Sequence, residues 1–343
     1  MTVFNHPSFD EHEKVVFCRD KQSGLKAIIA VHNTTLGPAF GGCRVWNYQT
    51  DDEALTDVLR LSQGMTYKTA LAGLAMGGGK AVIIGDTHLM DREQIFSAFG
   101  RAVNQLNGSY YSAEDVGTSP SDIKIASLQT PFVAGLEGKS GDPSPFTALG
   151  TYLGIKAAVK HKYNQDDLKD MRVAVQGVGH VGYYLCKHLY QNGAKLIVTD
   201  IDHRALERVS QEFAATVVAP QDIYHQDVDI YSPCALGATV NDSTLPLFKA
   251  AIIAGSANNQ LAETRHATAL KDLGILYAPD YVINAGGIIN ISFESNYNPE
   301  NARTKVNEIY HTLSRIFTQS EQQNRATAIV ADEMARQLIK NKA

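Results

Sequence analysis

One segment, residues 172–200, constrains the fold of this chain more than any other. The run RVAVQGVGHVG places Gly177, Gly179 and Gly182 directly after an apolar stretch typical of a buried strand. A second such stretch, KLIVTD, ends on Asp200. A G-x-G-x-x-G between a strand and a helix, followed by an acid at the end of the next strand, is the pattern of a dinucleotide-binding βαβ unit. The segment therefore predicts a doubly wound parallel sheet of the Rossmann type.

Each glycine of this motif has a physical role. Gly177 permits a tight turn, Gly179 lets a pyrophosphate approach the backbone, and Gly182 lets the helix pack close to the strand. The helix that follows opens with His180 and Val181, and its first N–H groups point toward the phosphates. We therefore predict that all five residues lie at the cofactor site.

The acid at the end of the second strand indicates which dinucleotide binds. Asp200 is placed to bind the ribose hydroxyls and to repel a 2′-phosphate, which predicts NAD as the cofactor. Arg204 lies nearby and would weaken this preference. A glycine-rich turn without a nucleotide is the alternative interpretation of the motif.

The chain has 343 residues, which favours two domains. The first part contains apolar strands followed by amphipathic helices, whereas strands and helices alternate after the stretch EGKSGDPSPFT at 137–147. Alternation predicts a parallel sheet covered by helices. We predict an α/β protein with a boundary in this stretch, and an NAD-binding domain over 137–325.

Composition excludes several partners and sites. A net charge of −5 without a basic run argues against nucleic acid, and the chain has neither an apolar run long enough to span a membrane nor a secretory signal. The four cysteines are far apart, which predicts reduced thiols in a cytoplasmic protein. No metal is predicted, because the 11 histidines show no ligand spacing.

A second glycine-rich segment, LAMGGGKAVIIGD, delivers Lys80 behind three glycines. It is no phosphate loop, because position 75 is Ala and position 81 is neither Ser nor Thr. Lys68 precedes it by twelve residues, and Asp115 ends a predicted strand of the same domain. Two ammonium groups in one cleft would lower each other's pKa, so that one lysine could act as a base beside a carboxylate.

The chain resembles the amino-acid dehydrogenase superfamily of glutamate, leucine, valine and phenylalanine dehydrogenases, and most of all the leucine dehydrogenases. The likeness covers nearly the whole chain and rests on ordered motifs: GPAFGGCR, GMTYKTALAGLAMGGGKAVI, SAEDVGTS, QGVGHVG, SPCALGATVND, AGSANNQL and PDYVINAGGIIN. It implies oxidative deamination of an amino acid, with NAD as hydride acceptor, by a homo-oligomer. It also implies a substrate-binding and oligomerisation domain over 1–136, to which a final helix at about 326–343 returns.

The resemblance implies roles for individual residues. Lys68 would hold the substrate carboxylate, Lys80 would activate water, and Asp115 would move protons. Gly41 and Gly42 would let the substrate lie against the backbone, and the glycines before Lys80 would clear space for it. Thr147 and Asn258 would touch the nicotinamide.

The side-chain pocket is expected to be apolar. The family's glutamate enzymes, as the resemblance implies, carry a lysine where this chain has Phe40 and a serine where it has Ile291. A buried glutamate carboxylate would stay unpaired here, so glutamate is excluded. The predicted substrate is a branched-chain aliphatic amino acid (Leu, Val or Ile), in a pocket lined by Phe40, Met65, Ala113, Ile288 and Ile291.

Three alternatives stay open at this point. An aromatic amino acid becomes the substrate if Phe40 swings aside. A 2-hydroxy-acid dehydrogenase would normally use a histidine base, and no histidine here has a glycine-framed position like that of Lys80. A non-catalytic NAD-binding regulator would not need Lys68, Lys80 and Asp115. His180, where relatives more often have Asn, is either a pyrophosphate contact or a solvated residue.

Overall fold

The computed structural model describes residues 3–86, 89–136 and 140–342, and the chain divides into two compact units. The first unit comprises Met1–Gly141, Glu294–Tyr297 and Ala335–Ala343, and the second comprises Asp142–Phe293 and Asn298–Met334. The predicted two-domain α/β fold is confirmed. Residues 137–139 of the predicted boundary stretch lie outside the described residues.

The first unit is built on a five-stranded mixed sheet of order β1-β2-β4-β3-β5. β1 and β4 run antiparallel to β2, whereas β3 runs parallel to both β4 and β5. The strands are β1 (Lys14–Arg19), β2 (Lys26–Asn33), β3 (Ala39–Trp46), β4 (Gly77–Ile84) and β5 (Tyr110–Glu114). The helices of this unit are η1 (Val3–Asn5), α1 (Asp51–Leu71), α2 (Arg92–Gln105) and α3 (Pro120–Ser127), with η4 (Glu294–Asn296).

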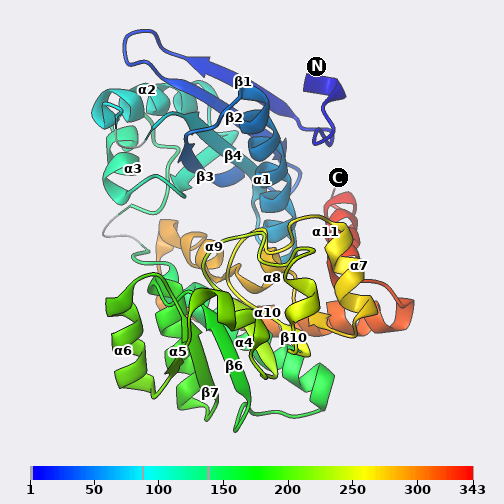
Figure 1. Ribbon diagram of the computed structural model, residues 1–343. Helices are drawn as coiled ribbons and strands as arrows, with labels where there is room; N and C mark the ends of the chain where they lie inside the picture. The colour runs from blue at the N-terminus through cyan, green and yellow to red at the C-terminus, as the bar shows by residue number, and fades with distance from the viewer. Residues whose placement is uncertain (1–2, 87–88, 137–139, 343) are drawn as a thin grey trace. The chain divides into compact units, whose positions relative to one another are not determined.

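The sheet of the first unit lies between two helical layers. α1 packs against one face, where Val58 and Leu59 meet Ile28 and Val82 of the sheet. α2 and α3 cover the other face over a larger apolar cluster. Figure 1 shows α1 beside β2 and β4.

Two helices of this unit begin at side-chain caps. The Thr50 side chain accepts a hydrogen bond from the Glu53 backbone N–H at 3.1 Å, at the start of α1. Ser119 and Asp122 form a reciprocal capping box at the start of α3, with Pro120 as its first residue. These local hydrogen bonds explain why both helices begin at these residues.

The second unit contains a six-stranded parallel sheet of order β11-β10-β9-β6-β7-β8. This is the strand order of a Rossmann fold, in which the chain reverses direction across the sheet between β6 and β9. The strands are β6 (Arg172–Gln176), β7 (Lys195–Thr199), β8 (Thr216–Val217), β9 (Ile230–Pro233), β10 (Ile252–Ile253) and β11 (Leu276–Tyr277). The predicted doubly wound sheet is thus confirmed.

Helices pack on this sheet and on each other. α5 and α6 lie beside β6 and β7 (Figure 1), and α4 packs against both α5 and α10. The helices are α4 (Ser144–Tyr163), α5 (His180–Gln191), α6 (His203–Phe213), η2 (Pro220–His225), η3 (Leu245–Leu247), α7 (Arg265–Asp272), α8 (Asp280–Ile283), α9 (Gly286–Ile291), α10 (Pro299–Gln323) and α11 (Thr327–Lys340). The end of α11, from Ala335 on, belongs to the first unit. Within the described part of the chain, no helix combines the length and apolarity needed to cross a membrane.

Candidate functional site

The alternation of side chains along a strand places Lys80 on the face of the first sheet that α1 covers. Val82 packs against α1, whereas Ala81 and Ile83 belong to the cluster on the opposite face. Because residues two apart in a strand share a face, Lys80 lies on the same side as Val82. Its side chain is buried, with a residue exposure of 6%.

Lys80 is paired with the acid that the sequence predicts beside it. Lys80 Nζ lies 2.9 Å from Asp115 Oδ2, just beyond the end of β5. Arg44 of β3 donates from Nε to the same oxygen at 3.1 Å. The carboxylate is therefore held between two cations.

Arg44 is itself held by a second acid. Its Nη1 donates to both carboxylate oxygens of Asp57 on α1, at 3.0 and 3.3 Å. The Tyr48 hydroxyl donates to Asp57 Oδ2 at 2.6 Å. We call the five residues Lys80, Asp115, Arg44, Asp57 and Tyr48 the charge ladder. The sequence reasoning missed its last three members.

The charge ladder fixes the ionisation of Asp115. Burial alone would raise the pKa of Asp115, but Lys80 and Arg44 outweigh it and hold that pKa at about 2. Burial likewise opposes the charge on Arg44, yet Asp115 and Asp57 together raise the pKa of Arg44. Asp115 is therefore ionised near neutral pH.

The other predicted lysine lies on α1. Lys68 is half-buried in the last turn of this helix, one turn after Met65. Between them, Thr66 Oγ1 bonds to His32 Nδ1 of β2 at 2.8 Å. This contact ties the C-terminal part of α1 to the sheet that carries Lys80.

The glycines before Lys80 make room for the chain itself. A Cβ at Gly78 would lie 2.1 Å from the backbone nitrogen of Thr66 in α1, and one at Gly79 would lie 2.7 Å from the ring of Tyr110. A Cβ at Gly77 would lie 2.1 Å from the carbonyl oxygen of Asn33, the last residue of β2. On their Cβ side these glycines are closely packed, and the expectation that they clear space for a substrate stays a prediction for their other side.

Gly41 and Gly42 are also closely packed on the side where a Cβ would lie. A Cβ at Gly41 would lie 1.8 Å from the Gly79 carbonyl oxygen, and one at Gly42 would lie 2.5 Å from the Glu114 carbonyl oxygen. Only the opposite side of each glycine is left for a substrate. Both residues are thus required by the packing of β3, whatever else they contact.

The first-unit residues of the predicted side-chain pocket are Met65 on α1, Phe40 on β3 and Ala113 on β5. Phe40 is 5% exposed and stacks on Tyr111, with ring centroids 6.4 Å apart. Ala113 is buried two residues further along β5. Phe40 is thus held by an aromatic neighbour, which restricts the swinging movement that an aromatic substrate would need.

The glycine loop of the second unit fits a dinucleotide. Gly177 has φ +98°, and a Cβ there would lie 2.6 Å from Ala235, at the end of the neighbouring strand β9. A Cβ at Gly182 would lie 2.0 Å from the Gly177 carbonyl oxygen. At Gly179, by contrast, no heavy atom of the described residues lies within 4 Å of that position, which leaves room for a pyrophosphate.

The residues around this loop complete the arrangement. His180 is exposed and Val181 half-buried in the first turn of α5. Asp200 Oδ2 accepts a hydrogen bond from Val178 N at 2.6 Å, and its Oδ1 accepts one from Asp202 N at 3.0 Å. Asp200 therefore fixes the loop and keeps free lone pairs for ribose hydroxyls.

The remaining predicted residues lie elsewhere in the second unit. A Cβ at Gly287 would lie 2.9 Å from Thr147 Oγ1, so Thr147 sits against α9, the helix that carries Ile288 and Ile291. Asn258 Oδ1 accepts from Asn284 Nδ2 at 2.7 Å. The structure thus places Thr147 beside the helix that carries two predicted pocket residues. It links Asn258 to Asn284, which the sequence analysis did not name as a site residue.

The structure also gathers Asp242, Glu263 and His266, whose possible ligand atoms lie within 4.8 Å of one another. The guanidinium of Arg265 already binds both carboxylates, with a shortest distance of 2.5 Å to Asp242 and 2.9 Å to Glu263. The two acids therefore have a cation of the chain itself, and we assign no metal to them.

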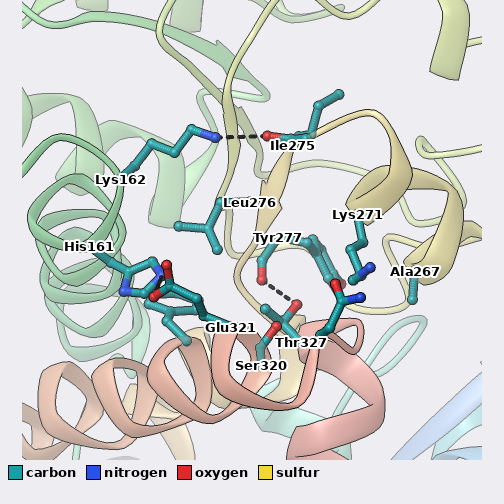
Figure 2. Close-up of a pocket in the computed structure, with 13 residues that line it drawn as sticks. His161, Lys162, Ala267, Lys271, Ile275, Leu276, Tyr277, Ser320, Glu321 and Thr327 are labelled. Atoms are coloured by element: carbon teal, nitrogen blue, oxygen red, sulfur yellow. Dashed lines mark hydrogen bonds and ion pairs between the residues drawn. The ribbon is translucent and has the colours of Figure 1, made fainter.

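A cavity of about 340 Å³ opens in the second unit between the ends of α4, α7 and α10 (Figure 2). Lys162 Nζ donates to the Gly274 carbonyl at 2.8 Å, and Thr327 Oγ1 donates to the Tyr277 carbonyl at 2.6 Å. These polar groups hold loops together. The described residues that line the cavity include none of the predicted site residues.

Comparisons with known proteins show the family to which the chain is similar. The family model "Glu/Leu/Phe/Val dehydrogenase, dimerisation domain" matches residues 12–131, and "Glutamate/Leucine/Phenylalanine/Valine dehydrogenase" matches 138–205 and 196–341. The chain is 52% identical to leucine dehydrogenase of Geobacillus stearothermophilus, over 99% of this chain and 94% of that protein. It is 43% identical to phenylalanine dehydrogenase of Caldalkalibacillus thermarum, over 100% and 95%.

Tryptophan dehydrogenase of Nostoc punctiforme is also similar, at 48% identity over 96% of this chain and 94% of that protein. Its crystal structure matches with a TM-score of 0.85 at 46% identity, covering 97% of both chains.

Proposed function

The chain belongs to the Glu/Leu/Phe/Val dehydrogenase family, and from this premise we propose that it oxidatively deaminates a branched-chain aliphatic L-amino acid to the 2-oxo acid and ammonia, reversibly. It is an NAD-dependent oxidoreductase acting on CH–NH₂, as the sequence predicts, and not a 2-hydroxy-acid dehydrogenase. The observation that carries the proposal is the buried pair of Lys80 and Asp115 within the family's domain.

When bound, NAD accepts the hydride that leaves the substrate Cα. Gly177, Gly179, Gly182 and the first turn of α5 would hold its pyrophosphate, and Asp200 its ribose. We propose that Thr147 and Asn258 contact the nicotinamide, as the resemblance implies.

Lys68 binds the substrate carboxylate in this proposal, and Lys80 acts on water. Loss of hydride leaves an imine, which water must attack at Cα. The neutral amine of Lys80 takes a proton from that water, and the carbinolamine then collapses to the 2-oxo acid and ammonia. Deamination therefore requires the neutral form of Lys80.

For Asp115 we propose a role through its charge, in place of the proton transfer that the resemblance implies. Lys80 and Arg44 hold its pKa at about 2, so the carboxyl stays ionised near neutral pH. Its negative charge stabilises the Lys80 ammonium and the cationic imine. Water or the substrate nitrogen would then move the proton.

The aliphatic assignment rests on Phe40 and on the leucine dehydrogenase at 52% identity. An aromatic substrate is the second candidate, because tryptophan and phenylalanine dehydrogenases are similar at 48% and 43% identity. Glutamate is excluded, because Phe40 and Ile291 offer its carboxylate no partner.

An amino-acid panel tests the assignment. Leu, Val, Ile, Phe, Trp and Glu are each assayed with NAD and with NADP, following the reduced nicotinamide by absorbance. We expect the aliphatic trio with NAD to give the highest kcat/KM and Lys80→Ala to abolish turnover. A kcat/KM for Phe roughly tenfold above those for Val and Leu would contradict the aliphatic assignment, since one pocket residue commonly controls that much.

We further propose a homo-oligomer that works in the cytoplasm. The first unit matches a model described as a dimerisation domain. The four cysteines, all within the described residues, are free thiols, as expected in a reducing compartment.

A further inference from the structure

The charge ladder contains more than a base and its partner. Lys80 Nζ and Arg44 Nε bind the same oxygen of Asp115, at 2.9 and 3.1 Å. The guanidinium then continues through Nη1 to Asp57. Charges of alternating sign therefore run from Lys80 to α1, and all four lie on side chains that are buried or at most about a quarter exposed.

A lysine paired only with a buried carboxylate would be a poor base. If it released its proton, the carboxylate would remain in the interior without a cation, which is strongly unfavourable. The pair would therefore keep the proton on the lysine. A second cation on the same oxygen removes this obstacle, because the carboxylate stays paired after the lysine becomes neutral.

We propose that Arg44 is a positioning residue that allows Lys80 to act as a base, by keeping Asp115 paired when Lys80 loses its proton. Asp57 sets the strength of this effect, because it neutralises part of the Arg44 charge and fixes its guanidinium. The inference rests on the proposed role of Lys80 in deamination. It adds a function for Arg44 and Asp57, which the proposed mechanism does not use.

Other titratable groups that interact electrostatically with Lys80 or Asp115 do not supply this charge. Cys43 of β3 and Tyr110 of β5 are fully buried, and burial raises the pKa of both well above the usual range, so both stay neutral. Tyr48 is also neutral, because burial and its hydrogen bond to Asp57 raise its pKa. Lys68 on α1 is a further cation, and the proposal assigns it to the substrate carboxylate.

The test is the pH dependence of kcat/KM for oxidative deamination of leucine with NAD. In Arg44→Gln, the acid-side limb should move to higher pH by roughly one unit, because a nearby positive charge no longer opposes protonation of Lys80. In Asp57→Asn the limb should move the opposite way, to lower pH. Arg44→Lys should restore much of the wild-type position, because it keeps the charge.

Two matched controls separate charge from general damage. Tyr48→Phe removes the hydrogen bond to Asp57 without changing any charge, so the limb should stay in place even if kcat falls. Arg101→Gln removes a surface arginine of the same unit, paired with Asp20 at 3.1 Å, and should leave the profile unchanged. Circular dichroism and thermal unfolding establish that each variant is folded.

Opposite shifts in the Arg44 and Asp57 variants support the inference. Unchanged limbs, or shifts in the same direction, overturn it. If Arg44→Gln does not fold, the direction of the shift in Asp57→Asn decides alone. Failure of the wild-type enzyme to oxidise any amino acid would instead refute the proposed function, so the two outcomes are distinct.

Discussion

At the scale of single residues, Gly179 allows cofactor binding to be separated from stability. Its φ of −62° suits any residue, and no described heavy atom lies within 4 Å of the position that an added methyl group would occupy. Gly179→Ala should therefore leave thermal unfolding unchanged, while the methyl group excludes the pyrophosphate. We expect KM for NAD to rise roughly tenfold or more, equivalent to about 1.4 kcal/mol of binding, with KM for leucine little changed.

The matched control is Gly182→Ala in the same loop. Its Cβ would lie 2.0 Å from a backbone oxygen, so the helix must move away from the strand. Overpacking of this kind costs about 1–3 kcal/mol of folding free energy. Equal losses of stability in both variants would contradict the assignment of free space to Gly179.

Phe40 is the residue that we expect to limit the size of the substrate side chain. It is buried and stacked on Tyr111, so its ring occupies volume at the expected pocket wall. Phe40→Leu should enlarge the pocket and raise the ratio of kcat/KM for phenylalanine over valine by roughly tenfold, in line with the 1–3 kcal/mol that one or two methylenes contribute. The amino-acid panel measures this ratio, and no change in it would mean that Phe40 only packs.

At the scale of elements, the contact of α1 with β4 depends on Gly78. A methyl group there would lie 2.1 Å from the Thr66 nitrogen, so Gly78→Ala must push α1 from the strand that carries Lys80. We expect a loss of about 1–3 kcal/mol in unfolding free energy and a higher KM for leucine, because Lys68 moves with the helix. Denaturant unfolding and steady-state kinetics measure the two effects.

Gly64 on α1 is the matched control. In the described structure nothing lies within 4 Å of the position of its Cβ. Gly64→Ala should raise stability by about 0.5–1 kcal/mol, because alanine is the better helix residue. A loss of stability in Gly64→Ala would show that α1 is destabilised even where an added methyl group has room. The effect of Gly78→Ala could then not be assigned to its contact with Thr66.

Elements with local signals could be predicted from the sequence, and elements that depend on packing could not. α1 and α3 have their capping residues, and β6, α5 and β7 follow from the glycine motif and its flanking apolar runs. β3 (Ala39–Trp46) and the glycine half of β4 were not predicted as strands, because glycine disfavours strands locally. Tight packing against α1 and neighbouring strands overrides that preference. α4 was missed because its first turn lies in the Pro- and Ser-rich boundary stretch.

At the scale of the whole molecule, the two sets of site residues differ in how far sequence could predict them. The cofactor loop has fixed spacing within one βαβ unit, so its residues are adjacent in sequence and in space. The Lys80–Asp115 pair joins the middle of β4 to the residue that follows β5, and its proximity required that both strands belong to one sheet. Arg44 and Asp57 could not be predicted, because their contact depends on the register of β3 and on the face of α1 that meets it.

The acid stability of the whole molecule should depend on a buried histidine that the reaction does not use. His32 bonds to Thr66, and the ring of His12 lies 4.8 Å away, centroid to centroid. Burial and the neighbouring His12 lower the pKa of His32 to about 4, although Asp10 opposes this. A histidine whose pKa is lower in the folded than in the unfolded chain stabilises the fold above about pH 6.5. That contribution is lost as pH falls from 6.5 toward 4.

We therefore expect the free energy of unfolding to fall by roughly 3 kcal/mol between pH 7 and pH 4 through His32. His32→Asn keeps a hydrogen-bonding group for Thr66 and has no charge to gain. It should lower stability at pH 7 but make the dependence on pH shallower, as measured by denaturant unfolding at pH 7, 5.5 and 4.5. His203→Asn, at an exposed position of the second unit, is the control and should retain the wild-type slope. A slope as steep in His32→Asn as in the wild type would mean that other groups, such as His12, govern unfolding in acid.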